Sequence, residues 1–536
     1  MKADEARLHL EAAENFAEIA EFKAEGKEEN LHRAIDGYKK ALLYFTREKS
    51  KTEYARIQNS LGNAYVGLAE VRDKEQNLKF AIKAYEKALK IYTTDGFTVD
   101  YAMIQNNLGG AYIRLAEVRD KENNLKQAIK AFEQALTIYT PEAFPVQYAV
   151  TQNNLGGAYS DLAEVREKED NLKRAIKAFE QALTIYTPDA FPVDYAMIQN
   201  NLGRAYIRLA DVRDKEENLK LAIKAFEKAI TIHTPDAFPV DYATTQNNLG
   251  NAYGMLSEVR DKEDNLTLAI KAFEQALTIY TPDAFPVYYA MTQNNLGIAY
   301  SDLAEVRDKE DNLKLAIKAY EEALKIRTPD AFPFHYAMIQ NNLGEACRLL
   351  AEVRDKENNL KHAMQAYERS LKIYTPDAFP VQYAGTQNNL GNAYSDLAEV
   401  RDKKNNLKLA IKAYEEALTI YTPDAFPINY AMIQNNLGIA FRKLADVKEK
   451  ENNLTLAIQA YEEALKIHML DAFPVDYANT TSNLARAYWT KGDNERAVEC
   501  FKEALAIYQK EGMVDRAKQL EDFLKSIAKP IAEKKS

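Results

Sequence analysis

A leucine returns at a fixed interval of 47 residues along most of the chain, without insertion or deletion. The ten positions are Leu61, Leu108, Leu155, Leu202, Leu249, Leu296, Leu343, Leu390, Leu437 and Leu484. A period of this size indicates a repeat array, in which each unit buries its apolar face only against its neighbours. The ten copies also form an internal comparison that separates constant from variable positions.

One copy, residues 289–334, shows two helical patterns of apolar residues. The first, helix A, contains Thr292, Leu296, Ala299, Tyr300 and Leu303. The second, helix B, contains Leu313, Ala316, Ile317, Tyr320, Ala323 and Leu324. Helix A, at about 20 residues, is expected to be roughly 30 Å long.

The boundaries between these helices are predicted from capping and proline chemistry. Asp311 or Asn312 is expected to cap helix B by accepting a bond from its free N–H groups. The stretch 328–333, Thr-Pro-Asp-Ala-Phe-Pro, is expected to end helix B, because proline lacks a backbone donor and disfavours helix in the preceding residue. The charge run at 305–311 is expected to be a solvated turn between the helices.

The pattern Leu296-Gly297-x-x-Tyr300, followed by Ala316-x-x-x-Tyr320, resembles the tetratricopeptide (TPR) repeat. The period exceeds the usual length of about 34 residues, so both helices are expected to be about two turns longer. The Asn-Asn-Leu element and the Pro-Val-x-Tyr-Ala entry resemble the kinesin-light-chain-like branch of the family. HEAT and armadillo repeats share the period but lack both motifs.

This resemblance implies an all-α fold, a right-handed α-α superhelical solenoid of antiparallel helix pairs. Residues 1–53 are expected to form a degenerate N-terminal helix pair that caps the array, and residues 54–476 nine 47-residue repeats. Residues 477–512 are expected to form a tenth repeat of ordinary TPR length, and residues 513–536 a C-terminal capping helix and tail.

Composition excludes several classes of protein. The formal net charge is −10 with 28% charged residues, and no basic stripe of a nucleic-acid-binding surface is present. No apolar run resembles a signal peptide or a membrane span, so a cytoplasmic location without membrane contact is expected.

Catalytic and metal-binding motifs are absent from the sequence. Cys347 and Cys500 each replace a core-facing residue in different repeats, and no His-x-x-x-His, Cys-x-x-Cys or P-loop motif occurs. We therefore expect no enzyme activity, no metal and no cofactor.

An asparagine ladder is the most constant polar feature. The Asn294 position is asparagine in every copy from Asn59 to Asn435 and becomes Ser482 in the last. In the TPR family this face of helix A lines a concave groove that contacts peptides, and similar asparagines grip the peptide backbone. A carboxamide both donates and accepts, which suits such a role. The alternative is that each asparagine bonds a neighbouring helix.

Charged residues vary along the same face, at the Ser301 and Asp302 positions. Such variation fits a face that reads ligand side chains, and equally an unconstrained surface. Arg114, Asp161 and Arg208 could instead pair between adjacent repeats. The complete set of peptide-binding candidates is Asn106, Asn153, Asn200, Asn247, Asn294, Asn341, Asn388, Asn435, Arg114, Arg208, Asp161, Asp302, Asp396, Arg348 and Arg442.

The resulting prediction is a non-enzymatic scaffold that binds a protein or peptide in the groove of the A helices. Two alternatives stay open. One is a regulatory or sensor protein that acts on an effector in trans. The other is a self-assembling structural protein, and a homo-oligomer fits either role.

Overall fold

The computed structural model describes the backbone of residues 2–533 and the side chains of residues 2–526. All regular structure in this range is α-helical, with 23 helices and no strand. The chain forms two compact units, Met1–Ile279 and Tyr280–Ser536. Residues 534–536 of the predicted tail lie outside the described residues. No helix in the described part of the chain is long and apolar enough to cross a bilayer.

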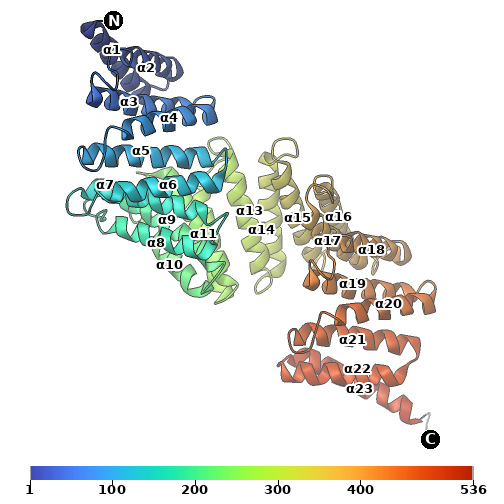
Figure 1. Ribbon diagram of the computed structural model, residues 1–536. Coiled ribbons are helices and arrows are strands. Elements are labelled where there is room, and N and C mark those ends of the chain that lie inside the picture. The colour runs from blue at the N-terminus through green and yellow to red at the C-terminus, as the bar shows by residue number, and fades with distance from the viewer. Residues whose placement is uncertain (1, 534–536) are drawn as a thin grey trace. The chain divides into compact units, whose positions relative to one another are not determined.

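The first unit contains six helix pairs (Figure 1), in which odd-numbered helices are A helices and even-numbered helices are B helices. They are α1 (Ala3–Phe22), α2 (Lys27–Ala41), α3 (Lys51–Ala69), α4 (Lys74–Leu89), α5 (Thr98–Ala116), α6 (Lys121–Leu136), α7 (Pro145–Leu162), α8 (Lys168–Leu183), α9 (Pro192–Ala210), α10 (Lys215–Ile230), α11 (Pro239–Ser257) and α12 (Lys262–Leu277). Each A helix packs on the following B helix, and each pair stacks on the next.

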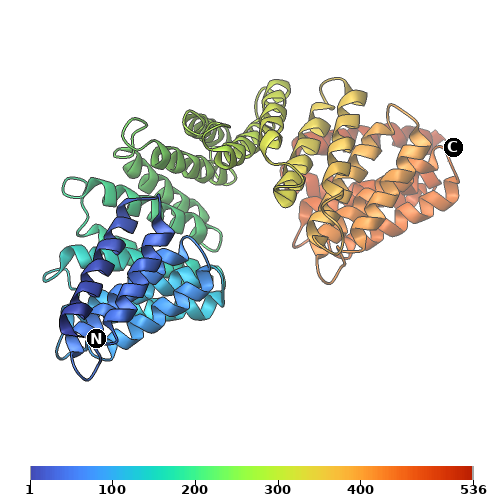
Figure 2. The same cartoon turned by 90° about the horizontal axis from the view of Figure 1, so that it is seen from above.

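The second unit repeats this arrangement with five pairs and a final helix. They are α13 (Pro286–Leu303), α14 (Lys309–Ile326), α15 (Pro333–Leu350), α16 (Lys356–Leu371), α17 (Pro380–Leu397), α18 (Lys403–Leu418), α19 (Pro427–Ala445), α20 (Lys450–Leu465), α21 (Pro474–Lys491), α22 (Asn494–Lys510) and α23 (Val514–Glu533). The pairing within each unit is visible from two directions (Figures 1 and 2). The prediction of an all-α solenoid of helix pairs is confirmed.

The repeat leucines and glycines explain how the pairs hold together. The ten leucines are 6–9% exposed, so their assignment to the core is confirmed. In nine repeats the next residue is a glycine that touches an aromatic ring of helix B. A Cβ atom on Gly297 would lie 2.6 Å from the Tyr320 ring, and the same holds for Gly156 and Phe179 at 2.7 Å. The Leu-Gly motif therefore sets the distance between the two helices.

The prolines mark helix boundaries as predicted, and they also start helices. From α7 onward each A helix has a proline in its first turn. Proline suits this position because its missing N–H would have no partner there.

The predicted cap of helix B is wrong. Helix α14 begins at Lys309, and its N-cap residue Asp308 has a left-handed backbone (φ 44°) with no side-chain cap bond. Asn312 lies inside the helix and donates its Nδ2 to the backbone carbonyl of Arg307, at 2.7 Å. The side chain thus satisfies a carbonyl of the turn between the two helices, because a free backbone carbonyl needs a donor.

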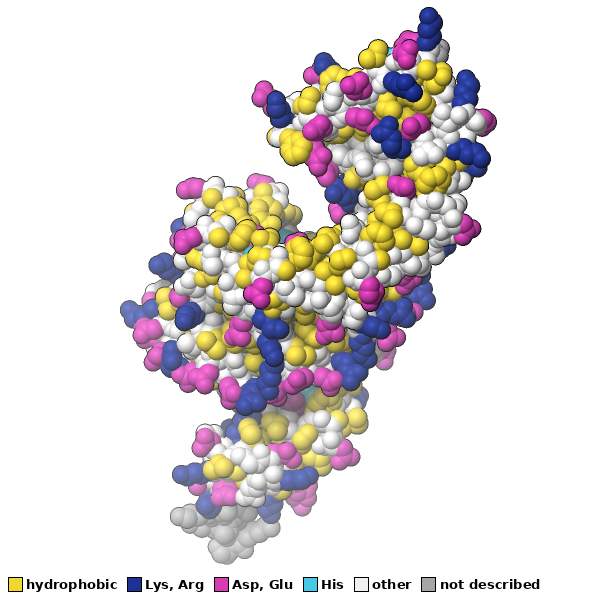
Figure 3. Space-filling model, turned by 90° about the vertical axis from the view of Figure 1, so that its left-hand side faces the viewer, with side chains coloured by type: hydrophobic (Ala, Val, Ile, Leu, Met, Phe, Trp, Pro, Cys, Tyr) yellow, Lys and Arg dark blue, Asp and Glu magenta, His cyan; other side chains and the backbone are white. Residues whose placement is uncertain are grey.

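The charge run in the turn faces solvent and also forms ion pairs between successive helix pairs. Lys356 Nζ lies 2.7 Å from Glu399 in the next pair, and Arg401 lies 2.6 Å from Glu357 in the preceding pair. Equivalent pairs occur at other interfaces in both units, for example Lys215 with Glu258 at 2.6 Å. Exposed pairs of this kind contribute little individually, so they favour the stacking register more than the total stability. On the face in Figure 3 the two signs of charge are interspersed.

Candidate functional site: the inner face of the A helices

The A helices line the inner side of each unit. Consecutive A helices contact one another in both units, whereas no two B helices do so in the described part of the chain. We define the inner face as the A-helix surface formed by the positions of Met291, Asn294, Ile298, Ser301 and Asp302. Met291 and Ile298 are exposed on it, at 37% and 40%.

The asparagine ladder connects neighbouring A helices. Within each unit, the second asparagine of an Asn-Asn pair donates its Nδ2 to the Oδ1 of the first asparagine in the preceding repeat. Asn248 donates to Asn200 at 3.1 Å in the first unit, and Asn389 donates to Asn341 at 3.2 Å in the second. The same bond reaches Asn106, Asn153, Asn294, Asn388 and Asn435.

The Oδ1 atoms of the ladder asparagines accept these bonds, and the Nδ2 donors of three of these asparagines stay available. Asn106 Oδ1 accepts from both Thr151 and Asn154, at 3.2 and 3.5 Å. The amide nitrogens of Asn106, Asn153 and Asn200 have no hydrogen-bond partner among the described residues. Asn247, Asn294 and Asn388 are buried, so the ladder is recessed between the helices.

The two arginine candidates in the first unit are paired, but not with Asp161. Arg114 lies 2.5 Å from Glu70, which also binds Lys27 at 2.9 Å. These two hydrogen bonds lower the pKa of Glu70. Arg208 donates to Ser160 and lies 3.3 Å from Glu164. Asp161, suggested as a partner for both arginines, makes no ion pair among the described residues, and burial raises its pKa.

In the second unit, Arg348 on α15 joins two helices. It donates to Glu345 at 2.7 Å and to Asp396 on α17 at 3.1 Å. Burial raises the pKa of Asp396, although Arg348 opposes the change. Burial acts to raise the pKa of Glu345, but the hydrogen bond and charge of Arg348 and the hydrogen bond from Tyr367 together outweigh it and the pKa falls. Asp302 on α13 occupies the same repeat position as Asp396 and is half-buried.

The last repeats differ because three of their arginines, Arg442, Arg486 and Arg516, make no ion pair among the described residues. Arg442 lies on α19 beside the buried Tyr461, whose pKa rises to about 12 through burial despite the nearby charge of Arg442. Arg486 and Arg516 line a cavity of about 370 Å³ at the end of the second unit. Arg516 binds the amide oxygen of Asn479, which also accepts from Tyr508 at 2.8 Å.

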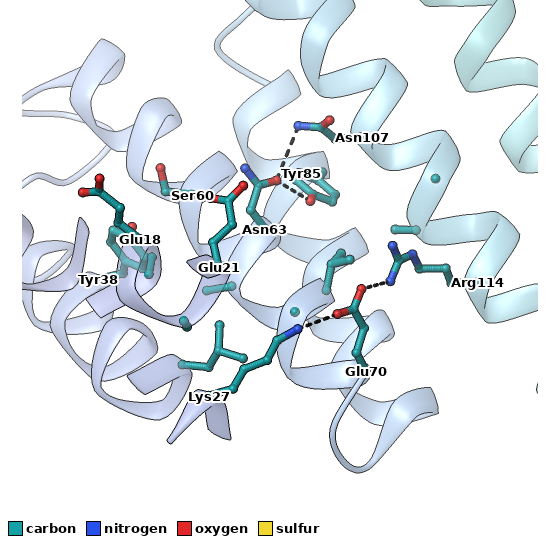
Figure 4. A pocket seen from close by; sticks show the side chains of 18 of the residues that line it. Glu18, Glu21, Lys27, Tyr38, Ser60, Asn63, Glu70, Tyr85, Asn107 and Arg114 are labelled. Carbon is teal, nitrogen blue, oxygen red and sulfur yellow. Dashed lines mark hydrogen bonds and ion pairs between the residues drawn. The ribbon is translucent and has the colours of Figure 1, made fainter. Parts of the chain in front are cut away.

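One cavity lies on the inner face of the first unit (Figure 4). It measures about 710 Å³ and is lined by α1, α2, α3, α4, α5 and α7. Tyr85 donates its hydroxyl to Asn63 at 2.7 Å on its floor, and Lys27, Glu70 and Arg114 form one side. Gly110 opens the space, since a Cβ there would meet nothing within 4 Å.

A row of methionines on the inner face was not predicted, although its 47-residue spacing is visible in the sequence. Met103, Met197, Met291 and Met432 occupy one position of the inner face and are 37–41% exposed. Met338 belongs to the same row, half-buried. Repeated exposed thioethers on one face suit adaptable contacts with a partner.

Within the described residues, no three His, Cys, Asp or Glu side chains are grouped as metal ligands would be. Cys347 is buried, and burial raises the pKa of its thiol to about 12, so the thiol stays protonated at neutral pH and is a poor nucleophile.

Sequence profiles of the tetratricopeptide repeat match residues 109–140, 156–187, 203–232, 250–281 and 391–422, residues 290–330, and residues 431–510. Together they cover slightly more than half of the chain. A comparison with curated protein sequences finds no match.

Solved structures of helical-repeat proteins are similar to this chain. They include human IFIT1 in a dimer with PPP-AAAA, at 16% identity over 90% of this chain and 97% of that one, with a TM-score of 0.37. The C-terminal part of a TPR repeat-containing protein from Cytophaga hutchinsonii matches at 18% identity over 57% and 95%, with a TM-score of 0.34. BtubC (BKLC) from P. vanneervenii matches at 21% identity over 47% and 92%, with a TM-score of 0.32.

Proposed function

The chain belongs to the tetratricopeptide repeat family, a family of protein-interaction scaffolds, and from this premise we propose that it binds an extended segment of a partner protein along the inner face of its A helices. The observation that carries the proposal is the exposed methionine row beside the amide ladder. An apolar row gives contact area, and amides next to it give hydrogen bonds to a peptide backbone.

The ladder contributes donors in this proposal. Because each Oδ1 already accepts from a neighbouring helix, the remaining capacity of Asn106, Asn153 and Asn200 lies mainly in their amide N–H groups. Such groups suit the backbone carbonyls of a ligand, which every peptide sequence supplies. The ladder then has two roles, joining the A helices and binding the ligand.

The arginines differ in how much they offer to acidic residues of a ligand. Arg114, Arg208 and Arg348 are neutralised by carboxylates of this chain, so they offer little to an acidic ligand. Arg486 and Arg516 line the final cavity with no ion pair among the described residues. We place acidic residues of the ligand at this end of the second unit.

The test is a random 12-residue peptide library displayed on phage and selected on the full chain. The affinity of a selected synthetic peptide is then measured by calorimetry for three variants. The first replaces Asn106, Asn153 and Asn200 by Asp, which keeps the acceptor and removes the donors. Each lost hydrogen bond should cost about 0.5–1.5 kcal/mol of binding.

A matched variant replaces Asn154, Asn201 and Asn248 by Ala, which removes the bonds between helices instead. We expect it to lower the melting temperature while leaving affinity per folded molecule nearly unchanged. The third variant, Arg486→Glu, should weaken peptides that carry acidic residues and spare the others. Equal affinity of the triple Asp variant and the wild type would contradict a ligand-binding ladder.

A further inference from the structure

One glycine interrupts the methionine row of the second unit. Gly385 on α17 stands where α15 has Met338 and α19 has Met432, one repeat away on either side. A Cβ on Gly385 would meet only the Tyr421 Oη, at 3.5 Å, which is an ordinary contact distance. The close packing that explains the Leu-Gly glycines is therefore absent here, and the missing side chain leaves space.

That space is a cavity of about 380 Å³ between α15, α17 and α19. The apolar and aromatic part of its lining is Met338, Met432, Tyr374, Tyr421 and Val381, and ladder amides such as Asn341 and Asn388 also line it. Its rim carries amides, among them Gln382 and Asn429, which occupy equivalent positions on α17 and α19. The volume lies within the range of about 300–1,000 Å³ typical of pockets that hold small ligands.

The aromatic walls are held in place. Tyr421 donates its hydroxyl to the Val381 carbonyl at 3.0 Å, and Tyr374 donates to the Phe334 carbonyl at 3.2 Å. Both rings are buried, at 6% and 3% exposure. Neither ring can turn to fill the gap at Gly385 without losing its hydrogen bond, so the cavity persists without a ligand.

The lining also defines what fits. It contains no Asp, Glu, Lys or Arg, unlike the cavity of the first unit with Lys27, Glu70 and Arg114. A charged side chain would lose its hydration here without gaining a partner, which is costly. A neutral apolar side chain carries no charge to desolvate and gains contacts with two thioethers and two rings.

We propose that Gly385 forms a socket for one aliphatic or aromatic side chain of the segment bound along the inner face. This inference rests on the proposed function and specifies its ligand. The rim amides of Gln382 and Asn429 bracket the backbone on either side of the inserted side chain. Gly385 is thus a specificity-determining position of the second unit.

The test fills the socket with the residue that the neighbouring repeats carry, Gly385→Met. This change removes a glycine from a helix interior, so the melting temperature should stay equal or rise. The full-length wild type and Gly385→Met are panned in parallel with the random 12-residue phage library. The variant Gly96→Met, at an exposed glycine in the loop before α5 where a Cβ would also meet nothing within 4 Å, is the matched control outside the inner face.

We expect the wild type and Gly96→Met to enrich the same peptides, each with a conserved apolar residue. Gly385→Met should bind them about tenfold or more weakly, and replacing the apolar peptide residue by Ala should weaken the wild type but not Gly385→Met. Equal binding to Gly385→Met would overturn the socket and leave the groove intact. No enrichment on the wild type would overturn groove binding and the socket together.

Discussion

The adjacent glycines Gly156 and Gly157 on α7 have opposite surroundings. A Cβ on Gly156 would lie 2.7 Å from the Phe179 ring, whereas one on Gly157 would meet nothing within 4 Å. We expect Gly156→Ala to destabilise the array by about 1–3 kcal/mol through overpacking. Gly157→Ala should stabilise it by about 0.5–1 kcal/mol, because a helix favours Ala over Gly. Urea unfolding followed by circular dichroism measures both, and midpoints that move in the same direction would contradict this packing.

Two buried histidines make stability depend on pH. His233 and His468 stand where other repeats have Tyr374 or Tyr421, and each contacts a threonine, Thr245 or Thr480. Burial lowers the pKa of both imidazoles, opposed by Asp241 and Asp476 respectively. The unfolded chain then binds protons more readily, so the stability that these sites contribute above the unfolded pKa of about 6.5 is lost as pH falls below it.

The double variant His233→Tyr/His468→Tyr isolates this effect. Its melting temperature should fall less between pH 7 and pH 5 than that of the wild type, as measured by calorimetry. The same slope in both proteins would show that these histidines are not the titrating groups.

At the scale of elements, the turn between helices A and B carries an unusual backbone. Nine Asp or Glu residues there have positive φ, from Asp73 to Glu449. A left-handed conformation costs a residue with a Cβ roughly 1–2 kcal/mol, and glycine avoids the cost. We therefore expect Asp120→Gly to be more stable than Asp120→Ala by about that amount. Both variants lose the same carboxylate, so the difference between their unfolding free energies reports the backbone alone.

The helices could be predicted from sequence because the period, the apolar stripes and the prolines all mark the same boundaries. The turn could not, because a left-handed residue is normally signalled by Gly or Asn and here is Asp or Glu. The place of Asn312 near a helix start predicts an acceptor, but the carbonyl of Arg307 lies within its reach and needs a donor.

The inner face was predicted less completely than the fold. The asparagine ladder is visible in sequence as a constant position, but its bonds join residues 48 apart and depend on how repeats stack. For the same reason the sequence suggests Asp161 as a partner of Arg114, whereas the stacking of the repeats brings Glu70 to it. The cavity at Gly385 could not be predicted, because Tyr374 and Tyr421 line it and only the fold brings them beside this glycine.

At the scale of the whole molecule, an array held by nearest-neighbour contacts should lose its ends first. We propose that α23 caps the last pair, since Phe523 packs on Phe501 and on Trp489, with ring centroids 5.0 and 6.2 Å apart. Trp489 is the only tryptophan of the chain, so its fluorescence reports this end alone. Phe523→Ala should shift the fluorescence transition to lower urea while the circular dichroism transition changes little. Transitions that shift together would contradict local capping.

The methionines allow the most direct test of binding along the inner face. Met103, Met197, Met255, Met291, Met338 and Met432 lie on the inner face, whereas Met364 lies on a B helix and Met469 in a loop. In the full chain labelled with 13C at the methionine methyl groups, a peptide selected from the phage library should shift inner-face resonances, Met338 and Met432 foremost. Met364 and Met469 should stay unchanged as internal controls. Shifts confined to Met364 and Met469 would contradict a ligand on the inner face.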